Sequence, residues 1–179
     1  MYYSKIYKTS ITDGPGVRVS LYVSGCRNHC PGCHNPESWD FCFGKEYTKD
    51  TEDKILEILD RDYIAGFSIV GGEPMEEENQ KVLVELLRRI KREHPDKNIW
   101  CFTGYEFEDL MIHGKKHTKV SMEILSYIDV LVTGRFDITK RDISDNNRWR
   151  GSTNQRVIDV KQSLAENKLI TVKDLPNNN

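Results

Sequence analysis

Hydrophobic and polar residues along this chain follow two periods, one typical of strands and the other typical of helices. From Val17 to Ser24 every second residue is apolar, which is the period of a strand with one buried face. Apolar residues three and four positions apart predict helices near residues 51–59, with Thr51 as the N-cap, 82–90 and 121–128. Short apolar runs predict further strands at residues 66–70, 98–103, 130–133 and 156–160.

Strands that alternate with helices indicate an α/β protein with a mainly parallel sheet. The chain has 179 residues, fewer than the roughly 250 of a complete eight-unit barrel. The pattern therefore predicts a partial, open (β/α) barrel. No linker or repeat interrupts the sequence, so we expect one domain over residues 1–179, with a frayed polar tail at residues 172–179.

Composition and charge limit the kinds of partner that this protein is expected to bind. No apolar stretch is long enough to cross a membrane, and a formal net charge of −2 offers nucleic acid no overall attraction. We therefore expect neither a membrane nor a nucleic acid as partner. The first residues lack the apolar core of a signal peptide, and five cysteines are an odd number for a disulfide framework. These features predict a reduced, cytoplasmic protein.

Three cysteines, Cys26, Cys30 and Cys33, directly follow the first predicted strand. Cubane iron-sulfur clusters are usually held by four thiolates, so three thiolates on one loop would leave one iron open to a substrate. A non-catalytic zinc site that adds His29 or His34 to the same cysteines is the alternative. Structural zinc sites usually combine two separated Cys/His pairs, however, and no second pair is visible in this sequence.

Small-residue motifs follow three of the later predicted strands. They are Gly71-Gly72-Glu73, Thr103-Gly104-Tyr105 and Thr133-Gly134-Arg135. In parallel α/β proteins ligands collect at the C-terminal edge of the sheet, where the strand-to-helix loops converge. Glycines there expose backbone groups to a ligand. We expect these motifs to line one cleft together with the cysteines, although each of the two later motifs could equally be a simple turn.

The cysteine spacing resembles the signature of the radical S-adenosylmethionine (SAM) enzymes. The upstream segment from Thr12 to Arg18, Thr-Asp-Gly-Pro-Gly-Val-Arg, and the run Cys-Pro-Gly-Cys-His-Asn-Pro are similar to the opening of the activating enzymes of glycyl radical proteins. Residues 100–105, 129–136 and 151–156 look like later segments of the short members that act on anaerobic ribonucleotide reductases. The resemblance thus covers nearly the whole chain.

This resemblance implies the cofactors. Cys26, Cys30 and Cys33 would be the catalytic metal ligands of one 4Fe-4S cluster, and S-adenosyl-L-methionine would bind the open iron and be cleaved reductively. The Gly-Gly-Glu element would contact the methionine amino group, so that a side chain at Gly72 should expel the cofactor and spare the cluster. Radical SAM enzymes often carry an aromatic residue where this chain has Gly32, so the adenine contact is expected from backbone around Gly32 to His34 or from elsewhere. The His34 ring could pack on the adenine, or His34 could be a simple loop residue. The expected cofactor-binding residues are Gly32, Cys33, His34, Gly71, Gly72 and Glu73.

The resemblance also implies the partners. They are the large subunit of an anaerobic ribonucleotide reductase, whose glycine-bearing loop would receive the radical, and a low-potential electron donor such as flavodoxin or ferredoxin. A locally basic stretch is our candidate docking surface for the subunit; it contains Arg135, Arg148, Arg150 and Arg156. The alternative is that this stretch is only a solvated loop. A radical SAM enzyme that acts on a small molecule, of the deazapurine synthase type, is a further alternative.

Two cysteines lie outside the motif. Additional ferredoxin-like clusters would need about eight more cysteines, so we expect a single cluster. Cys101 falls in a predicted strand and is expected to be a small buried residue. Cys42 lies among Trp39, Phe41 and Phe43 and is expected to belong to a hydrophobic plug over the cluster loop, with a redox role as the alternative.

Overall fold

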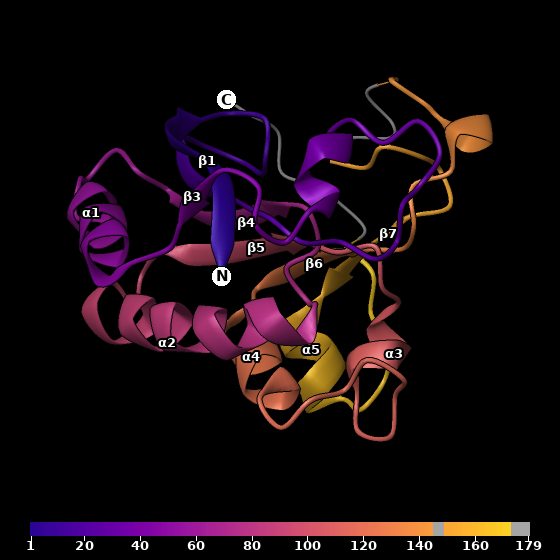
Figure 1. The fold of residues 1–179 in the computed structure, drawn as a ribbon. Coiled ribbons are helices and arrows are strands. Elements are labelled where there is room, and N and C mark those ends of the chain that lie inside the picture. Colours follow the sequence, from indigo (N-terminus) through magenta and orange to yellow (C-terminus); the bar gives the residue numbers. More distant parts are fainter. Residues whose placement is uncertain (145–148, 173–179) are drawn as a thin grey trace.

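A mixed sheet of seven strands runs through the computed structural model, which describes residues 1–144 and 149–172 (Figure 1). The strands are β1 (Tyr2–Ser10), β2 (Arg18–Val23), β3 (Lys45–Glu46), β4 (Gly66–Gly71), β5 (Asn98–Phe102), β6 (Val130–Thr133) and β7 (Arg156–Asp159). Their order across the sheet is β3-β1-β2-β4-β5-β6-β7. Strands β2, β4, β5 and β6 are parallel to one another, whereas β3, β1 and β7 join the edges antiparallel. The predicted open α/β sheet with a parallel centre is confirmed.

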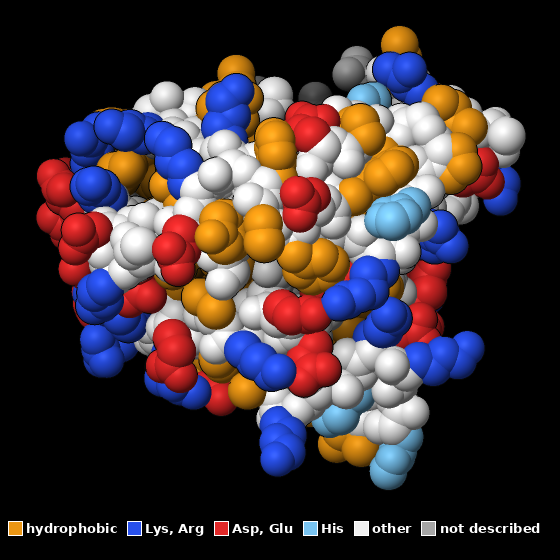
Figure 2. Space-filling view, in the orientation of Figure 1, with side chains coloured by type: hydrophobic (Ala, Val, Ile, Leu, Met, Phe, Trp, Pro, Cys, Tyr) orange, Lys and Arg blue, Asp and Glu red, His pale blue; other side chains and the backbone are white. Residues whose placement is uncertain are grey.

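The helices lie mainly on one side of this sheet. They are α1 (Lys49–Leu59), α2 (Glu77–Glu93), α3 (Phe107–Leu110), α4 (Ser121–Tyr127) and α5 (Val160–Ala165), with short 3-10 helices η1 (Pro36–Trp39) and η2 (Ile138–Lys140). Figure 1 shows α2, α4 and α5 below the sheet, with η1 in purple and η2 in orange above it. Charged side chains of both signs cover α1 and α2 (Figure 2). Among them, Arg89 forms ion pairs with Glu52 and Asp53.

Helix α1 begins earlier than its apolar pattern predicted. Its N-cap is Thr48, in extended backbone, whose hydroxyl accepts the N–H of Thr51 at 3.3 Å. An N-cap residue satisfies one of the amide groups that have no partner within the first turn. Thr51 itself is buried inside that turn, so its prediction as the cap was wrong by three positions.

The register of the parallel strands places their C-terminal ends at one edge of the sheet. Val23 at the end of β2 is paired with Gly71 at the end of β4, and β5 and β6 continue the same register. Fully buried residues such as Leu21, Ile69 and Leu131 hold these strands in the core. The loops that follow the four strands therefore emerge side by side, as the sequence predicted.

Strand β1 has no counterpart in the sequence-based prediction, because most of its side chains are exposed or half-buried and leave no clear apolar period. Within the described part of the chain, no helix combines the length and apolar character that crossing a bilayer requires. Most of the predicted frayed tail, from residue 173 on, lies outside the described residues, as does Arg148.

Candidate functional site

A cleft lies at the C-terminal edge of the sheet, where β2, β4, β5 and β6 end. Its lining includes Cys26, Cys30, Cys33, His34, Gly71, Gly72, Glu73, Thr103, Gly104 and Gly134. The prediction that the three cysteines and the motifs after the later strands share one cleft is therefore confirmed. Tyr105, Thr133 and Arg135 belong to the same motifs but are not part of the lining.

The cysteine loop presents three free thiols to this cleft. Cys26 and Cys30 are buried, and Cys33 is half-buried. The N–H of Asn35 donates to Cys33 Sγ at 3.4 Å. Burial, reinforced by the charge of Glu73, raises the pKa of the Cys26 thiol to about 11, although the backbone N–H groups of Asn28 and His29 favour the thiolate. N–H···S hydrogen bonds of this kind surround cluster-bound sulfur.

The Gly-Gly-Glu element packs directly against the base of the cysteine loop. The N–H of Gly72 donates to the Val23 carbonyl at 2.8 Å, and the N–H of Glu73 donates to the Gly25 carbonyl at 2.9 Å. A Cβ atom on Gly72 would lie 2.7 Å from the Gly25 oxygen and 2.8 Å from the Ser38 oxygen. Gly72 is therefore required by the protein's own backbone. A side chain there would displace the loop that carries the cysteines. This packing argues against the expectation that such a substitution spares the cluster, and that expectation stays a prediction to be tested.

Glu73 is fully buried, although it lines the cleft. Burial raises the pKa of its carboxyl to about 7, against the hydrogen bonds that it accepts from the Thr103 hydroxyl and from the N–H groups of Met75 and Gly104. Two further buried polar residues, Glu76 and Asn79, follow it at intervals of three. Sequence analysis missed both of them. The signal was present as polar residues with helical spacing that lead into the first turn of the amphipathic helix α2.

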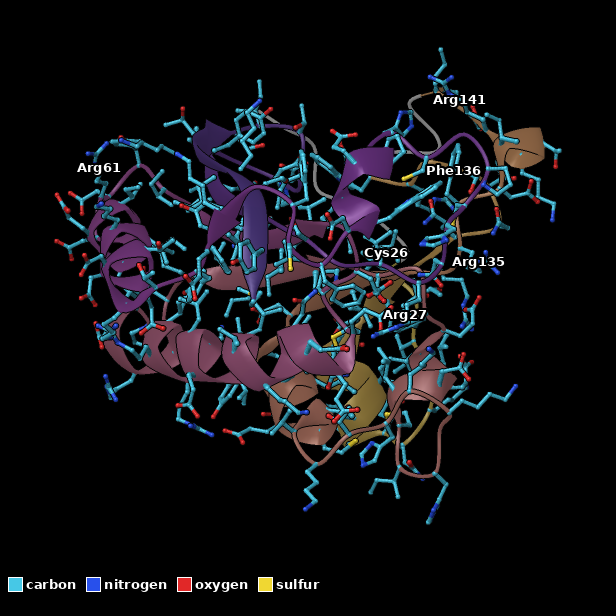
Figure 3. The ribbon with its side chains drawn as sticks, viewed as in Figure 1. Cys26, Arg27, Arg61, Arg135, Phe136 and Arg141 are labelled. Atoms are coloured by element: carbon cyan, nitrogen blue, oxygen red, sulfur yellow. The ribbon has the colours of Figure 1, made fainter. Side chains whose placement is uncertain are left out.

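Aromatic rings surround the mouth of the cysteine loop. His34 packs on Phe136 with ring centroids 5.5 Å apart, and both residues line the cleft. Figure 3 shows Phe136 on the same side of the molecule as Cys26. His29 instead stacks on Trp39, with centroids 4.6 Å apart. Sequence analysis did not single out Phe136, although it lies only two residues after Gly134.

Gly32, the predicted backbone contact for adenine, lies outside the cleft lining. It is exposed, and a Cβ atom there would meet Cδ1 of Ile138 at 2.2 Å. Its positive φ of 73° is a conformation that favours glycine. In this structure Gly32 therefore accommodates the segment that follows β6, whereas Cys33 and His34 face the cleft.

The two remaining cysteines differ in environment. Cys101 is fully buried, as predicted, and burial raises the pKa of its thiol well above the usual value. Cys42 is exposed, so its expected place in a hydrophobic plug was wrong. The neighbouring Phe41 does cover the loop, because its ring lies where a Cβ atom on Gly25 would be.

The basic stretch after β6 makes internal contacts. The guanidinium group of Arg135 donates to the carbonyl of Asn28, and Arg156 forms ion pairs with Glu106 and Glu108 at 2.6 and 2.7 Å. Arg150 donates to the Gln155 carbonyl at 3.3 Å. The charge of Arg156 is thus balanced locally, and this stretch is less basic at the surface than its sequence indicated.

The residues present fit an iron-sulfur cluster held by three thiolates. The thiols are free and share one cleft, and the sulfur of Cys33 receives an N–H···S hydrogen bond. The indole N–H of Trp39, which also lines the cleft, is buried without a hydrogen-bond partner in the described part of the chain. Residues 1–144 and 149–172 contain no group of three His, Cys, Asp or Glu side chains gathered around a single metal ion. In a cluster, by contrast, each thiolate binds its own iron.

Comparison with known proteins gives a consistent result. The family model described as "4Fe-4S single cluster domain" matches residues 12–158. The anaerobic ribonucleoside-triphosphate reductase-activating protein of Pasteurella multocida is 41% identical over 87% of this chain and 95% of its own length. The proteins of the same name from Enterobacteria phage T4 and Escherichia coli K12 are 34% and 38% identical, over 88% of this chain and 93% and 97% of their own lengths. The chain therefore belongs to the 4Fe-4S family of anaerobic ribonucleoside-triphosphate reductase-activating proteins.

Proposed function

We propose that this protein cleaves S-adenosylmethionine reductively at a 4Fe-4S cluster and thereby generates a glycyl radical on an anaerobic ribonucleotide reductase. The observation that carries this proposal is the shared cleft. Three free thiols from one loop line it together with the Gly-Gly-Glu element and the ends of β5 and β6. The names of the relatives supply the target, because each is called an activating protein of anaerobic ribonucleoside-triphosphate reductase.

In this proposal Cys26, Cys30 and Cys33 would hold the cluster through three of its irons, which would leave one iron for the cofactor. When bound, cluster and cofactor would supply the radical chemistry, in which one electron from a donor would cleave a carbon-sulfur bond of the sulfonium and a hydrogen atom would pass from the glycine to the carbon so released. The protein's own residues exclude water and orient the reacting groups. Gly71 lets β4 approach the end of β2, and Gly72 lets it approach the cysteine loop. His34 and Phe136 form an aromatic wall of the cleft.

The remaining parts of the proposal concern the setting of the reaction. We propose the large reductase subunit as the partner, flavodoxin or ferredoxin as the electron donor, and residues 1–179 as one radical SAM domain. A cytoplasmic location is supported by five free cysteines, since disulfides persist mainly in oxidising compartments.

Anaerobic reconstitution with iron and sulfide tests the proposal. The reconstituted protein should be brown and, after reduction, should convert S-adenosylmethionine to methionine and deoxyadenosine. Addition of the anaerobic ribonucleoside-triphosphate reductase of the source organism should produce a glycyl radical signal in electron paramagnetic resonance. Turnover of a small molecule without a radical on the reductase would contradict the activase proposal, and a colourless protein that holds stoichiometric zinc would contradict the cluster.

A further inference from the structure

The first half of the cysteine loop is held from a distant part of the chain. The N–H of Arg27 donates to Glu76 Oε1 at 2.9 Å, and the side-chain amide of Asn79 donates to the Ser24 carbonyl at 3.0 Å. The side-chain amide of Asn28 donates to Glu73 Oε2 at 3.0 Å. Glu73, Glu76 and Asn79 thus form a buried polar row, spaced by three residues, that holds Ser24, Arg27 and Asn28.

Glu73 is the member of this row that also reaches β5. Its Oε1 accepts the Thr103 hydroxyl at 2.6 Å and the Met75 N–H at 2.9 Å, and its Oε2 accepts the Gly104 N–H at 2.7 Å in addition to the Asn28 amide. Both carboxylate oxygens therefore already have two donors. A buried carboxylate satisfied in this way fixes the groups around it and has little capacity left for a ligand.

Asn28 connects this hydrogen-bond network to the proposed cluster ligand Cys26. Its side chain donates to Glu73, and its carbonyl accepts from Arg135 on the segment after β6. Its backbone N–H belongs to the residue two positions after Cys26 and favours the thiolate form of that cysteine. A displacement of Asn28 would change this interaction, and N–H···S interactions influence the reduction potential of a bound cluster.

We infer that Glu73 is a positioning residue that acts on the cluster site through Asn28, by holding the Cys26–Cys30 part of the loop against the ends of β4 and β5. This inference rests on the proposed function in taking the three cysteines as cluster ligands. It differs from the role that the family resemblance implies for the Gly-Gly-Glu element, because it assigns the Glu73 side chain to the loop that carries the ligands.

A double-mutant cycle on the reconstituted full chain tests this inference. Asn28→Ala, Glu73→Gln and the double variant are compared for iron content, for the electron paramagnetic resonance spectrum of the reduced cluster and for its midpoint potential. Asn28→Ala should retain iron and lower the potential, because a weaker N–H···S bond destabilises the more negative reduced cluster. The effects of the two substitutions should not add, since they interrupt the same path. Cofactor cleavage should fall about 10- to 100-fold in each single variant, as for other residues that support metal ligands.

Glu52→Gln is the matched control, because Glu52 is also a buried glutamate with strong partners but lies on α1. It should lower the melting temperature without changing the potential or the spectrum. Additive effects of Asn28→Ala and Glu73→Gln, or a wild-type potential in Asn28→Ala, would overturn the inference. If Glu73→Gln fails to retain iron, the midpoint potential of Asn28→Ala alone still tests the inference. A wild-type protein that holds a cluster but cleaves no S-adenosylmethionine would contradict the proposed function while leaving this comparison of potentials valid.

Discussion

The two ends of the parallel sheet each contain one buried charged side chain that joins neighbouring strands. At the end where β2, β4 and β5 begin, Arg18 is fully buried and donates to Ser68 Oγ and to Asn98 Oδ1, both at 2.7 Å. It also donates to the carbonyls of Pro15, Phe67 and Asn98. At the opposite end, Glu73 accepts four hydrogen bonds. Both ions are satisfied mainly by neutral groups.

The two networks differ in what they leave accessible. Burial lowers the pKa of Arg18 to about 10, so it remains a cation at neutral pH, enclosed by acceptors. Glu73 holds a loop whose thiols face a cleft. Figure 3 shows the ends far apart, with Arg61, which precedes β4, at the left and Cys26 toward the right. A buried ionisable side chain thus fills one end of the sheet, the closed end at Arg18, and another supports a cleft at the opposite end, the open end at Glu73. Substitutions at the closed end should therefore change stability, and substitutions at the open end should change cluster chemistry.

The largest effect is expected from Cys26→Ser, Cys30→Ser or Cys33→Ser. Each should abolish the cluster and all cofactor cleavage, because a serine oxygen replaces thiolate poorly as an iron ligand. Iron analysis and the visible spectrum measure the loss. Cys42→Ser is the control, since Cys42 is exposed and outside the cleft lining. Retention of iron by Cys33→Ser together with its loss in Cys42→Ser would show that the ligands have been assigned wrongly.

Arg18→Met should affect the closed end only. Removal of the guanidinium group leaves the Asn98 side-chain oxygen and several carbonyls without their buried donor, so the free energy of unfolding should fall by about 3 kcal/mol or more. Urea denaturation measures this change. The cluster spectrum per folded molecule should stay as in the wild type. Arg61→Met, an exposed arginine at the same end, is the control and should be nearly silent. An altered cluster spectrum in Arg18→Met would show that the two ends are coupled.

Gly72→Val should disturb the open end and, to a smaller extent, the whole fold. Its Cβ atom would meet the Gly25 and Ser38 carbonyl oxygens at less than 3 Å, a form of overpacking that typically costs about 1–3 kcal/mol. Because Gly25 precedes Cys26, iron content should fall together with stability. Gly72→Ala should show the same defect in weaker form. Normal iron content combined with lost cofactor binding would instead support the direct cofactor contact that the sequence suggested.

The smallest effect is expected at Asp129, which lies just before β6 and accepts the Ile99 N–H at 2.7 Å. Burial opposes the ionisation of Asp129. The pKa of its carboxyl nevertheless lies below the usual value, because Lys161, the Ile99 N–H and Lys91 stabilise the carboxylate. A lowered pKa in the folded state stabilises the fold above the unfolded-state pKa, and this contribution is lost as the pH falls through the folded-state value. Asp129→Asn should therefore destabilise the protein at neutral pH by about 1 kcal/mol and flatten the decline of stability below pH about 4. An unchanged acid denaturation curve would exclude this role.

The regular parts of the fold and the grouping of the site residues could be predicted from sequence. Strands β2, β4, β5 and β6 are apolar enough to show their period, and the ends of parallel strands converge whatever the details of the loops. This convergence is why the order of residues along the chain sufficed to place the cysteines and the glycine motifs in one cleft.

Other features depend on contacts that the pattern does not contain. A strand's apolar run carries no information about its direction, so the antiparallel pairing of β7 was not foreseen. A glycine is needed at position 72 because the carbonyl groups of Gly25 and Ser38, which are distant in sequence, would lie too close to a side chain there. The ion pairs of Arg156 could not be foreseen, because its acidic partners belong to the segment around α3.

The polar row of Glu73, Glu76 and Asn79 also has a consequence for the order in which the protein is made. The residues that it holds, Ser24 to Asn28, lie 45 to 55 positions earlier in the chain. On a ribosome the cysteines therefore emerge well before the segment that shapes their loop. We expect the nascent loop to be a poor iron acceptor, and cluster insertion to follow the docking of α2. An iron-delivery system would then meet this protein as a folded apo-form whose three thiols already face a common cleft.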